Sequence, residues 1–394
     1  MRILQVHNHY QQQGGEHGVF EAEARLLQAH GHEVLQFTRD NATVGQLHPL
    51  QLAQRTLWNQ EVFRELRALI RRTRPSVMHA HNTLPLISPA AYYAAQKEGV
   101  PVVQTLHNYR LVCPSGVLFR DGHVCELCVG KRIPWPGVVH ACYRGSRAAS
   151  AGVALMLAGH TLAGTWQRKV NVFVALTEFS RRKFVQGGIP EGQILVKPNF
   201  VEVDPGSGLH SGGYGLFVGR LAPEKGVETL IDAWRMMMDP IPLKIVGGGP
   251  SEAQLRASSA GVSQVHFLGP QPAALVRELM RDAWVLIVPS RWYEGLPLVV
   301  LEGFAAGLPV VASDLGSLSG LIDHERTGLL FRPGDAADLR QKLAWAVSHP
   351  EAVAAMGRRA RQVYEERYNA GTNYRLLMDI YSAAGVDPGL AERR

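Results

Sequence analysis

The chain repeats one pattern along its length. A short run of β-branched and other apolar residues is followed by a turn with Gly, Pro or Asn, and then by apolar residues at helical spacing. In the first half this pattern predicts a helix at 19–30 and strands at 3–6, 33–37, 77–80, 100–105 and 172–176. Alternation of strands and helices predicts a parallel sheet with helices on both faces.

The same pattern starts again after residues 204–215, a Gly/Ser-rich stretch with little apolar content, as linkers have. Here strands are predicted at 215–218, 243–246, 265–268, 285–288 and 310–312, and helices at 227–234 and 297–306. At 394 residues the chain exceeds the roughly 250–300 residues beyond which chains divide into domains.

We therefore predict an α/β protein of two Rossmann-like, doubly wound domains that face a cleft. The first domain is expected at 1–205, the second at 206–372, and a last helix within 373–394 that packs back on the first domain. Ligands of open α/β sheets bind beyond the carboxyl ends of the strands, so the cleft is the expected active site.

Composition and charge narrow the classes of partner. The formal net charge is +7, which favours anionic partners, but no Lys/Arg run with interleaved aromatic residues indicates nucleic acid. The apolar start is too short for a signal peptide, and the apolar stretch 148–159 is too short to cross a bilayer. We expect a cytoplasmic protein. The apolar stretches 133–139 and 148–157 suit contact with the inner face of the membrane, with burial in the protein as the alternative.

The loop after the predicted strand 215–218 carries two cations. Residues 219–226 read GRLAPEKG and lead into a predicted helix. Arg220 offers a planar fork of donors that suits phosphate, and Lys225 offers a compact charge. Glycines on either side allow backbone to approach a ligand closely. The loop is a candidate diphosphate site, with an ordinary solvated turn as the alternative.

A second candidate segment, residues 294–302, reads EGLPLVVLE. Pro297 suits the first turn of a helix, and Gly307 suits its end. Glu294 then lies on the loop before the helix, where it can meet sugar hydroxyls. Glu302 lies inside the helix, where it can accept bonds from a ribose diol. A half-buried carboxylate paired with a Lys or Arg is the alternative for Glu302.

Together these segments resemble the GT-B-fold retaining glycosyltransferases of family 4, the glycosyl transferases group 1. The resemblance rests on GRL and EKG within 219–226, on Glu294 and Glu302 with seven residues between them, and on GGGP at 247–250, FLG at 267–269, VPS at 288–290 and GLPVVAS at 307–313. It covers essentially the whole chain, more specifically in the second half. It departs at 316–320, where family members often carry a glutamate and this chain reads GSLSG.

The resemblance implies a hexosyltransferase (EC 2.4) that uses a UDP- or GDP-sugar and a hydroxyl acceptor, such as a lipid-linked saccharide in bacterial polysaccharide or glycolipid biosynthesis. In the family the residues that match Arg220 and Lys225 hold the donor diphosphate, Glu294 contacts the transferred sugar, and Glu302 contacts the ribose. The backbone that caps the diphosphate and sugar corresponds to Gly295, Leu296, Pro297, Leu298 and Val299. The family works without a catalytic metal, and this chain has no Asp-x-Asp motif.

Two residues of the first half are assigned roles mainly because of the resemblance. Gly14 and Gly15 follow the first predicted strand; by themselves they indicate a turn, but the family has a Gly-rich loop here, so Gly15 is a predicted donor contact. His107 follows the predicted strand 100–105 and therefore faces the cleft. The family places a functional His at this point, so we predict a catalytic role for His107. His79 and His81 end another strand, and one of them could line the acceptor side.

All four cysteines fall in one loop-like segment, as Cys113, Cys125, Cys128 and Cys142. A pair two residues apart with further thiols nearby is typical of zinc-site spacing, and some family members carry a comparable insert. Structural zinc is one expectation for the four thiols. Buried, reduced thiols or one redox disulfide are the alternatives.

Retention of configuration by double displacement needs a carboxylate nucleophile next to the anomeric carbon. Because the sequence offers no obvious candidate, a front-face departure and attack is the favoured mechanism. Two other functions remain open: a sugar-nucleotide epimerase on the same scaffold, and a non-catalytic protein that binds a nucleotide sugar.

Overall fold

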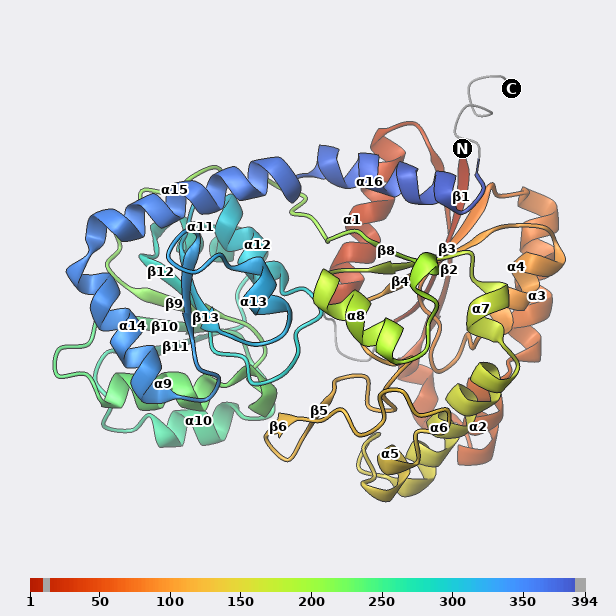
Figure 1. Cartoon of the computed structure of the whole chain (residues 1–394), viewed down its shortest axis with the longest axis horizontal. Helices are drawn as coiled ribbons and strands as arrows, with labels where there is room; N and C mark the ends of the chain where they lie inside the picture. Colours follow the sequence, from red (N-terminus) through yellow and green to blue (C-terminus); the bar gives the residue numbers. More distant parts are fainter. Residues whose placement is uncertain (10–14, 387–394) are drawn as a thin grey trace. The chain divides into compact units, whose positions relative to one another are not determined.

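A computed structural model describes residues 1–9 and 15–386 of the chain (Figure 1). It contains two compact units. Unit 1 holds residues 1–118, residues 126–199 and the C-terminal segment that begins at Asn373. Unit 2 holds Phe119–Cys125 and Phe200–Thr372. Gly14 of the predicted glycine loop lies outside the described residues.

Unit 1 is built on a six-stranded sheet whose neighbouring strands all pair in parallel. The strand order is β2-β1-β3-β4-β7-β8, with bounds β1 (Arg2–His9), β2 (Glu33–Asp40), β3 (Val77–Asn82), β4 (Val102–Leu106), β7 (Val172–Ala175) and β8 (Ile194–Val196). The chain enters at β1, turns outward to β2, and then crosses to β3 on the other side of β1. The order of strands therefore reverses between β1 and β3.

Helices lie on both sides of this sheet, with α3 and α4 on one side and α1 on the other (Figure 1). The helices of unit 1 are α1 (Gly15–Ala29), α2 (Pro49–Leu57), α3 (Gln60–Thr73), α4 (Ala90–Lys97), α5 (Trp135–Val139), α6 (Arg147–Leu162), α7 (Thr165–Lys169), α8 (Glu178–Gln186) and α16 (Ala370–Ala383). The last of these belongs to the core: Leu377, Ile380 and Tyr381 of α16 pack with Ile3 and Val77 of the central strands. Helix α16 therefore contributes to the same core as the strands β1 and β3.

Unit 2 repeats this design with a parallel sheet in the order β11-β10-β9-β12-β13-β14. The strands are β9 (Gly215–Val218), β10 (Leu243–Val246), β11 (Val265–Gly269), β12 (Val285–Val288), β13 (Val310–Ser313) and β14 (Gly328–Phe331). The helices are α9 (Val227–Arg235), α10 (Glu252–Ser258), α11 (Ala273–Asp282), α12 (Leu298–Ala305), α13 (Ser317–Leu321), α14 (Ala336–Ser348) and α15 (Pro350–Arg367). Here the order reverses between β9 and β12, as in dinucleotide-binding folds.

The cysteine loop adds a short antiparallel hairpin of β5 (Phe119–Arg120) and β6 (His123–Val124), which groups with unit 2, and the short helix α5, which belongs to unit 1. Among the described residues, no helix combines the length and the apolar character needed to cross a bilayer. Two parallel, doubly wound sheets are present, so the predicted fold class is confirmed.

Candidate functional site

The loops at the switch point of unit 2 pack backbone against backbone. Gly226 has φ +68°, and a Cβ on it would lie 1.9 Å from the carbonyl oxygen of Pro289, which follows β12. Gly247, after β10, has φ +132°, and a Cβ there would lie 1.9 Å from the carbonyl oxygen of Gly219. Only glycine fits at each of these positions. The loops after β9, β10 and β12 are therefore in direct backbone contact and form one rim, at the edge of the sheet where doubly wound folds bind ligands.

Two of the predicted site residues meet on this rim. Lys225 donates a hydrogen bond of 2.7 Å from Nζ to Oε1 of Glu294, and Ser290 donates one of 2.6 Å to the same oxygen. Glu294 is only 5% exposed. Burial alone would raise the pKa of Glu294, but Lys225 and Ser290 outweigh it and the pKa is lowered. The carboxylate is therefore ionised and fixed, with a cation beside it.

Lys225 also lies over an aromatic ring, since its Nζ is 5.3 Å from the centroid of Trp292. Arg220 is more open: its side chain is half exposed and pairs with Glu224 one turn further along. An exposed pair of this kind contributes little to stability, so an incoming anion can take the guanidinium from Glu224 at small cost. The loop thus presents one fixed cation and one that can change partner.

Helix α12 begins at Leu298, after the loop that carries Glu294. Pro297 is its N-cap residue rather than its first helical residue, and no side chain caps the helix. The first amide groups of a helix have no acceptor within the helix, so those near Leu298 and Val299 can donate to an anion. Glu302, one turn inside, is partly buried. Burial raises its pKa, and Arg277 acts against that rise.

In unit 1, His107 directly follows β4 and stands at the head of a buried polar network. Its Nε2 lies 3.0 Å from Nδ1 of His81, and Nε2 of His81 lies 3.2 Å from Oε1 of Glu23. His79 lies 3.0 Å from the same carboxylate oxygen, and Lys197 pairs with the other oxygen at 3.1 Å. His107, the residue predicted to be catalytic, is therefore in contact with His81, which in turn contacts Glu23.

Two imidazoles of this network, those of His107 and His81, are held neutral. Burial lowers the pKa of His107 well below its usual range, and the neighbouring His81 lowers it further. Burial also lowers the pKa of His81, with His79 adding to the effect, to about 4. At neutral pH His107 can donate or accept a hydrogen bond but carries no charge.

Sequence reasoning missed Glu23 and Lys197, which anchor this network. A signal for Glu23 was present, because it lies on the same helical face as the buried residues Val19 and Leu27. A carboxylate on that face requires a partner. The sequence alone does not indicate Lys197, because its partner lies 174 residues away.

The remaining predicted residues take the following places. Gly15 is the exposed first residue of α1. Cys113 and Cys128 are buried, and Cys125 and Cys142 are partly buried. The groups of metal-binding side chains found among the described residues contain histidines and glutamate but no cysteine. The roles predicted for these residues stay predictions.

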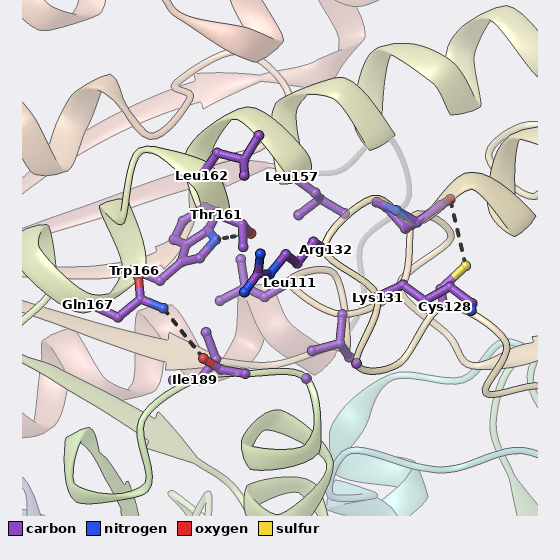
Figure 2. A pocket seen from close by; sticks show the side chains of 15 residues that line it. Leu111, Cys128, Lys131, Arg132, Leu157, Thr161, Leu162, Trp166, Gln167 and Ile189 are labelled. Carbon is purple, nitrogen blue, oxygen red and sulfur yellow. Dashed lines mark hydrogen bonds between the residues drawn. The ribbon is translucent and has the colours of Figure 1, made fainter.

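A cavity of about 510 Å³ opens beside the cysteine loop in unit 1 (Figure 2). Leu111, Leu157, Trp166 and Ile189 line it, and Arg132 lies among them in the same view. Several large apolar side chains close in sequence to the residues that line this cavity are exposed, namely Leu127, Ile133, Trp135, Val139, Leu155 and Leu162. Within the predicted membrane-contact stretches 133–139 and 148–157, the large apolar side chains of Ile133, Trp135, Val139 and Leu155 are exposed, and most of the other residues are buried or partly buried.

Two family models match the chain. The model described as Glycosyltransferase Family 4 matches residues 13–205, and the model described as Glycosyl transferases group 1 matches residues 211–363. The chain is built from two glycosyltransferase family domains. The family 4 domain contains His107 and its network, and the group 1 domain contains Arg220, Lys225, Glu294 and Glu302.

Curated relatives match part of these glycosyltransferase domains. The D-rhamnosyltransferase WbpZ of Pseudomonas aeruginosa is 34% identical over 159 residues, which is 39% of this chain and 41% of the relative. The D-inositol 3-phosphate glycosyltransferase of Gordonia bronchialis is 33% identical over 184 residues, which is 43% of this chain and 40% of the relative. The alignments therefore span less than half the length of these relatives.

Solved structures match the whole glycosyltransferase fold. HepE of Anabaena, in complex with UDP-glucose, has a TM-score of 0.70 at 19% identity and covers 97% of this chain and 100% of that chain. Sucrose-phosphate synthase from Thermosynechococcus elongatus has a TM-score of 0.71 at 18% identity and covers 97% and 98%. At such identities the likeness shows the fold alone, which is the predicted GT-B fold.

Proposed function

We propose that this protein transfers a sugar from a nucleotide-diphosphate sugar to a hydroxyl group of an acceptor. The observation that carries the proposal is the Lys225–Glu294 pair at the switch point of unit 2, with Glu294 on the loop that leads into α12. A fixed cation, open helix amides and an ionised carboxylate fit a sugar joined to a diphosphate. Relatives named as glycosyltransferases, and the neighbour HepE that holds UDP-glucose, support the same class of donor.

Each donor-site residue then has a distinct role. Arg220, Lys225 and the backbone N–H groups of Gly295, Leu296, Leu298 and Val299 bind the diphosphate and stabilise the negative charge that builds on it as the sugar departs. Glu294 accepts hydrogen bonds from hydroxyls of the transferred sugar, and Glu302 accepts them from the ribose. The raised pKa of Glu302 suits a carboxyl whose partner arrives with the donor. The donor is a UDP- or GDP-sugar.

The roles of His107 and Gly15 rest on the family resemblance. We propose that neutral His107 contacts the sugar through a hydrogen bond, and that His81 and Glu23 hold its ring in place. The configuration is proposed to be retained by departure and attack on one face of the sugar. Mass spectrometry after rapid quenching tests this mechanism, because a trapped covalent glycosyl-enzyme would overturn it.

The acceptor is proposed to be a lipid-linked saccharide at the inner face of the membrane. Exposed Ile133 and Trp135 stand beside Lys131 and Arg132, and such a basic and aromatic surface binds anionic interfaces. Sedimentation with anionic liposomes tests this contact. The Trp135→Ser variant should sediment less than wild type, whereas Met238→Ser, which alters an exposed apolar residue of unit 2, should sediment equally.

Structural zinc in the cysteine loop remains our proposal for the four thiols. Metal analysis of the purified protein and thiol titration test it together. Bound zinc with thiols protected from titration supports the site, and four readily titrated thiols without zinc refute it.

A donor and acceptor panel tests the function as a whole. Release of nucleoside diphosphate that requires an acceptor supports transfer. An isomerised donor without acceptor would instead indicate an epimerase, and binding without any turnover would indicate a non-catalytic protein.

A further inference from the structure

Three histidines that the donor site does not use gather at the switch point of unit 1. His7 and His9 lie two residues apart at the end of β1 and so share one face of the sheet. His17 lies in the first turn of α1. One ring nitrogen of each histidine lies within 4.8 Å of those of the other two. The ring of His9 is central, with its centroid 4.8 Å from that of His7 and 4.9 Å from that of His17.

Three of the six ring nitrogens in this cluster are buried and have no hydrogen-bond partner among the described residues. His7 is fully buried, and within the described part of the chain neither of its ring nitrogens has a hydrogen-bond partner. The same holds for Nδ1 of His17. Phe20 stacks on His7 at 4.7 Å and offers no acceptor. A buried polar group without a partner destabilises the folded state, so a ligand on these nitrogens would offset that cost.

The residue types of the cluster, three imidazoles whose ring nitrogens converge, indicate the kind of ligand. Burial lowers the pKa of His7 to about 2, and the neighbouring histidines His81, His9 and His17 add to the effect. Burial and His17 also lower the pKa of His9, against the opposite effect of Asp40 and Glu21. Neutral imidazoles do not attract an anion, but their lone pairs are the form of histidine that binds transition metals.

We propose that His7, His9 and His17 bind a divalent transition-metal ion, for which Zn²⁺ is the test ion. Three imidazoles leave one position of a tetrahedral ion open to water or another ligand. Nitrogens bound at about 2.0–2.1 Å to zinc lie roughly 3.4 Å apart, so small side-chain rotations must close the cluster around the ion. The carboxylate of Glu16, 3.9 Å from His7 Nδ1, lies beside the site.

The second cluster of metal-type ligands, Glu23, His79 and His81, is not proposed as a site. Lys197 already places an ammonium group 3.1 Å from the Glu23 carboxylate and takes the place a cation would occupy. The causes that lower the pKa of His7 and His9 are burial and neighbouring histidines, and within the described residues no Lys or Arg is among them.

The test is a titration of the full chain, without a histidine tag and stripped of metal by a chelator, with Co²⁺ and Zn²⁺. Cobalt distinguishes this site from the cysteine loop, because thiolate ligands add an intense near-ultraviolet charge-transfer band that imidazoles do not give. Competition with a chromogenic chelator gives the zinc affinity. His9→Ala and His17→Ala each remove one ligand that is only partly buried, and His266→Ala alters an exposed histidine of unit 2 as the control.

We expect this site to take up one equivalent of cobalt with visible bands and no thiolate band, separate from any equivalent that gives the thiolate band of the cysteine loop. Both ligand variants should weaken zinc binding at this site roughly 100-fold or more, whereas His266→Ala leaves it unchanged. Zinc should also raise the unfolding temperature of wild type by more than that of the ligand variants, since it binds only the folded state. Equal zinc affinity in wild type, His9→Ala and His17→Ala, with matching metal-free circular dichroism, would overturn the proposal.

Discussion

The buried ion pair between Lys197 and Glu23, in the network of His107, allows the effect of a substitution on stability to be worked out in detail. Lys197 is 1% exposed, and its Nζ lies 3.1 Å from Oε2 of Glu23 and 3.2 Å from Oδ1 of Asn373. Replacing Lys197 with Met keeps the length of the side chain but removes the charge. Removing one partner of a buried pair costs about 3–5 kcal/mol, because the other charge is left without compensation.

Protonation of Glu23 limits this cost. Protonating a carboxyl group with an ordinary pKa of about 4.3 at pH 7 costs about 3.7 kcal/mol, at about 1.36 kcal/mol for each pH unit. We therefore expect Lys197→Met to lower the free energy of unfolding of unit 1 by about 3–4 kcal/mol at pH 7. The double variant with Glu23→Gln should recover much of that loss, since no buried charge remains.

The sign of the pH dependence follows from the pKa of Glu23. Burial would raise this pKa, but Lys197, His79 and His81 outweigh burial and hold it well below the usual range. A lowered folded-state pKa adds stability above the unfolded pKa, which is lost as pH falls through the folded value. Without Lys197 the pKa of Glu23 rises, so the carboxyl is protonated at higher pH. The difference between wild type and variant should therefore shrink from pH 7 toward pH 4.

Urea unfolding followed by pulsed hydrogen exchange of peptides from β1, β3 and β4 measures the stability of unit 1 separately from unit 2. A loss of less than about 1 kcal/mol at pH 7, the size of an exposed pair, would refute the reasoning. A large loss that does not change with pH, or that the double variant does not relieve, would refute it as well.

Further predictions concern the donor site. Lys225→Ala and Glu294→Ala should each reduce turnover by several orders of magnitude, and near-normal rates with a working donor would exclude them from the site. Gly226→Ala should abolish activity and destabilise unit 2, because its Cβ would lie 1.9 Å from a carbonyl oxygen. Gly261 also has a positive φ, +79°, but a Cβ added to it would have no atom within 4 Å. Gly261→Ala should therefore lower the free energy of unfolding, measured by thermal unfolding, only by the roughly 1–2 kcal/mol backbone cost. Because the pKa of His107 is well below its usual range, initial rates should show no titration of this residue between pH 6 and 8; a pH 6.5 transition that His107→Asn removes would contradict this.

Several features of the fold were predictable because they rest on local patterns. The inner strands of both sheets are buried on both faces and appear as apolar runs, so β1, β3 and β4 and β9, β10 and β12 were recognised. The edge strands β8 and β14 were not predicted. Parallel pairing followed from the alternation of strands and helices. The fold class therefore came from the sequence.

The candidate site divides in the same way. The sequence by itself determined the types of residue at the ends of β9 and β12, since cations, carboxylates and glycines follow those strands directly. Only the tertiary structure decided that Lys225 pairs with Glu294, 69 residues away, and that Lys197 reaches Glu23 across 174 residues. It also decided that His7, His9 and His17 converge at the end of β1. Within the described residues, the buried Nδ1 atoms of His7 and His17 have no hydrogen-bond partner there. The physical reason is that charge and burial at these positions depend on contacts between distant segments, which no local pattern encodes.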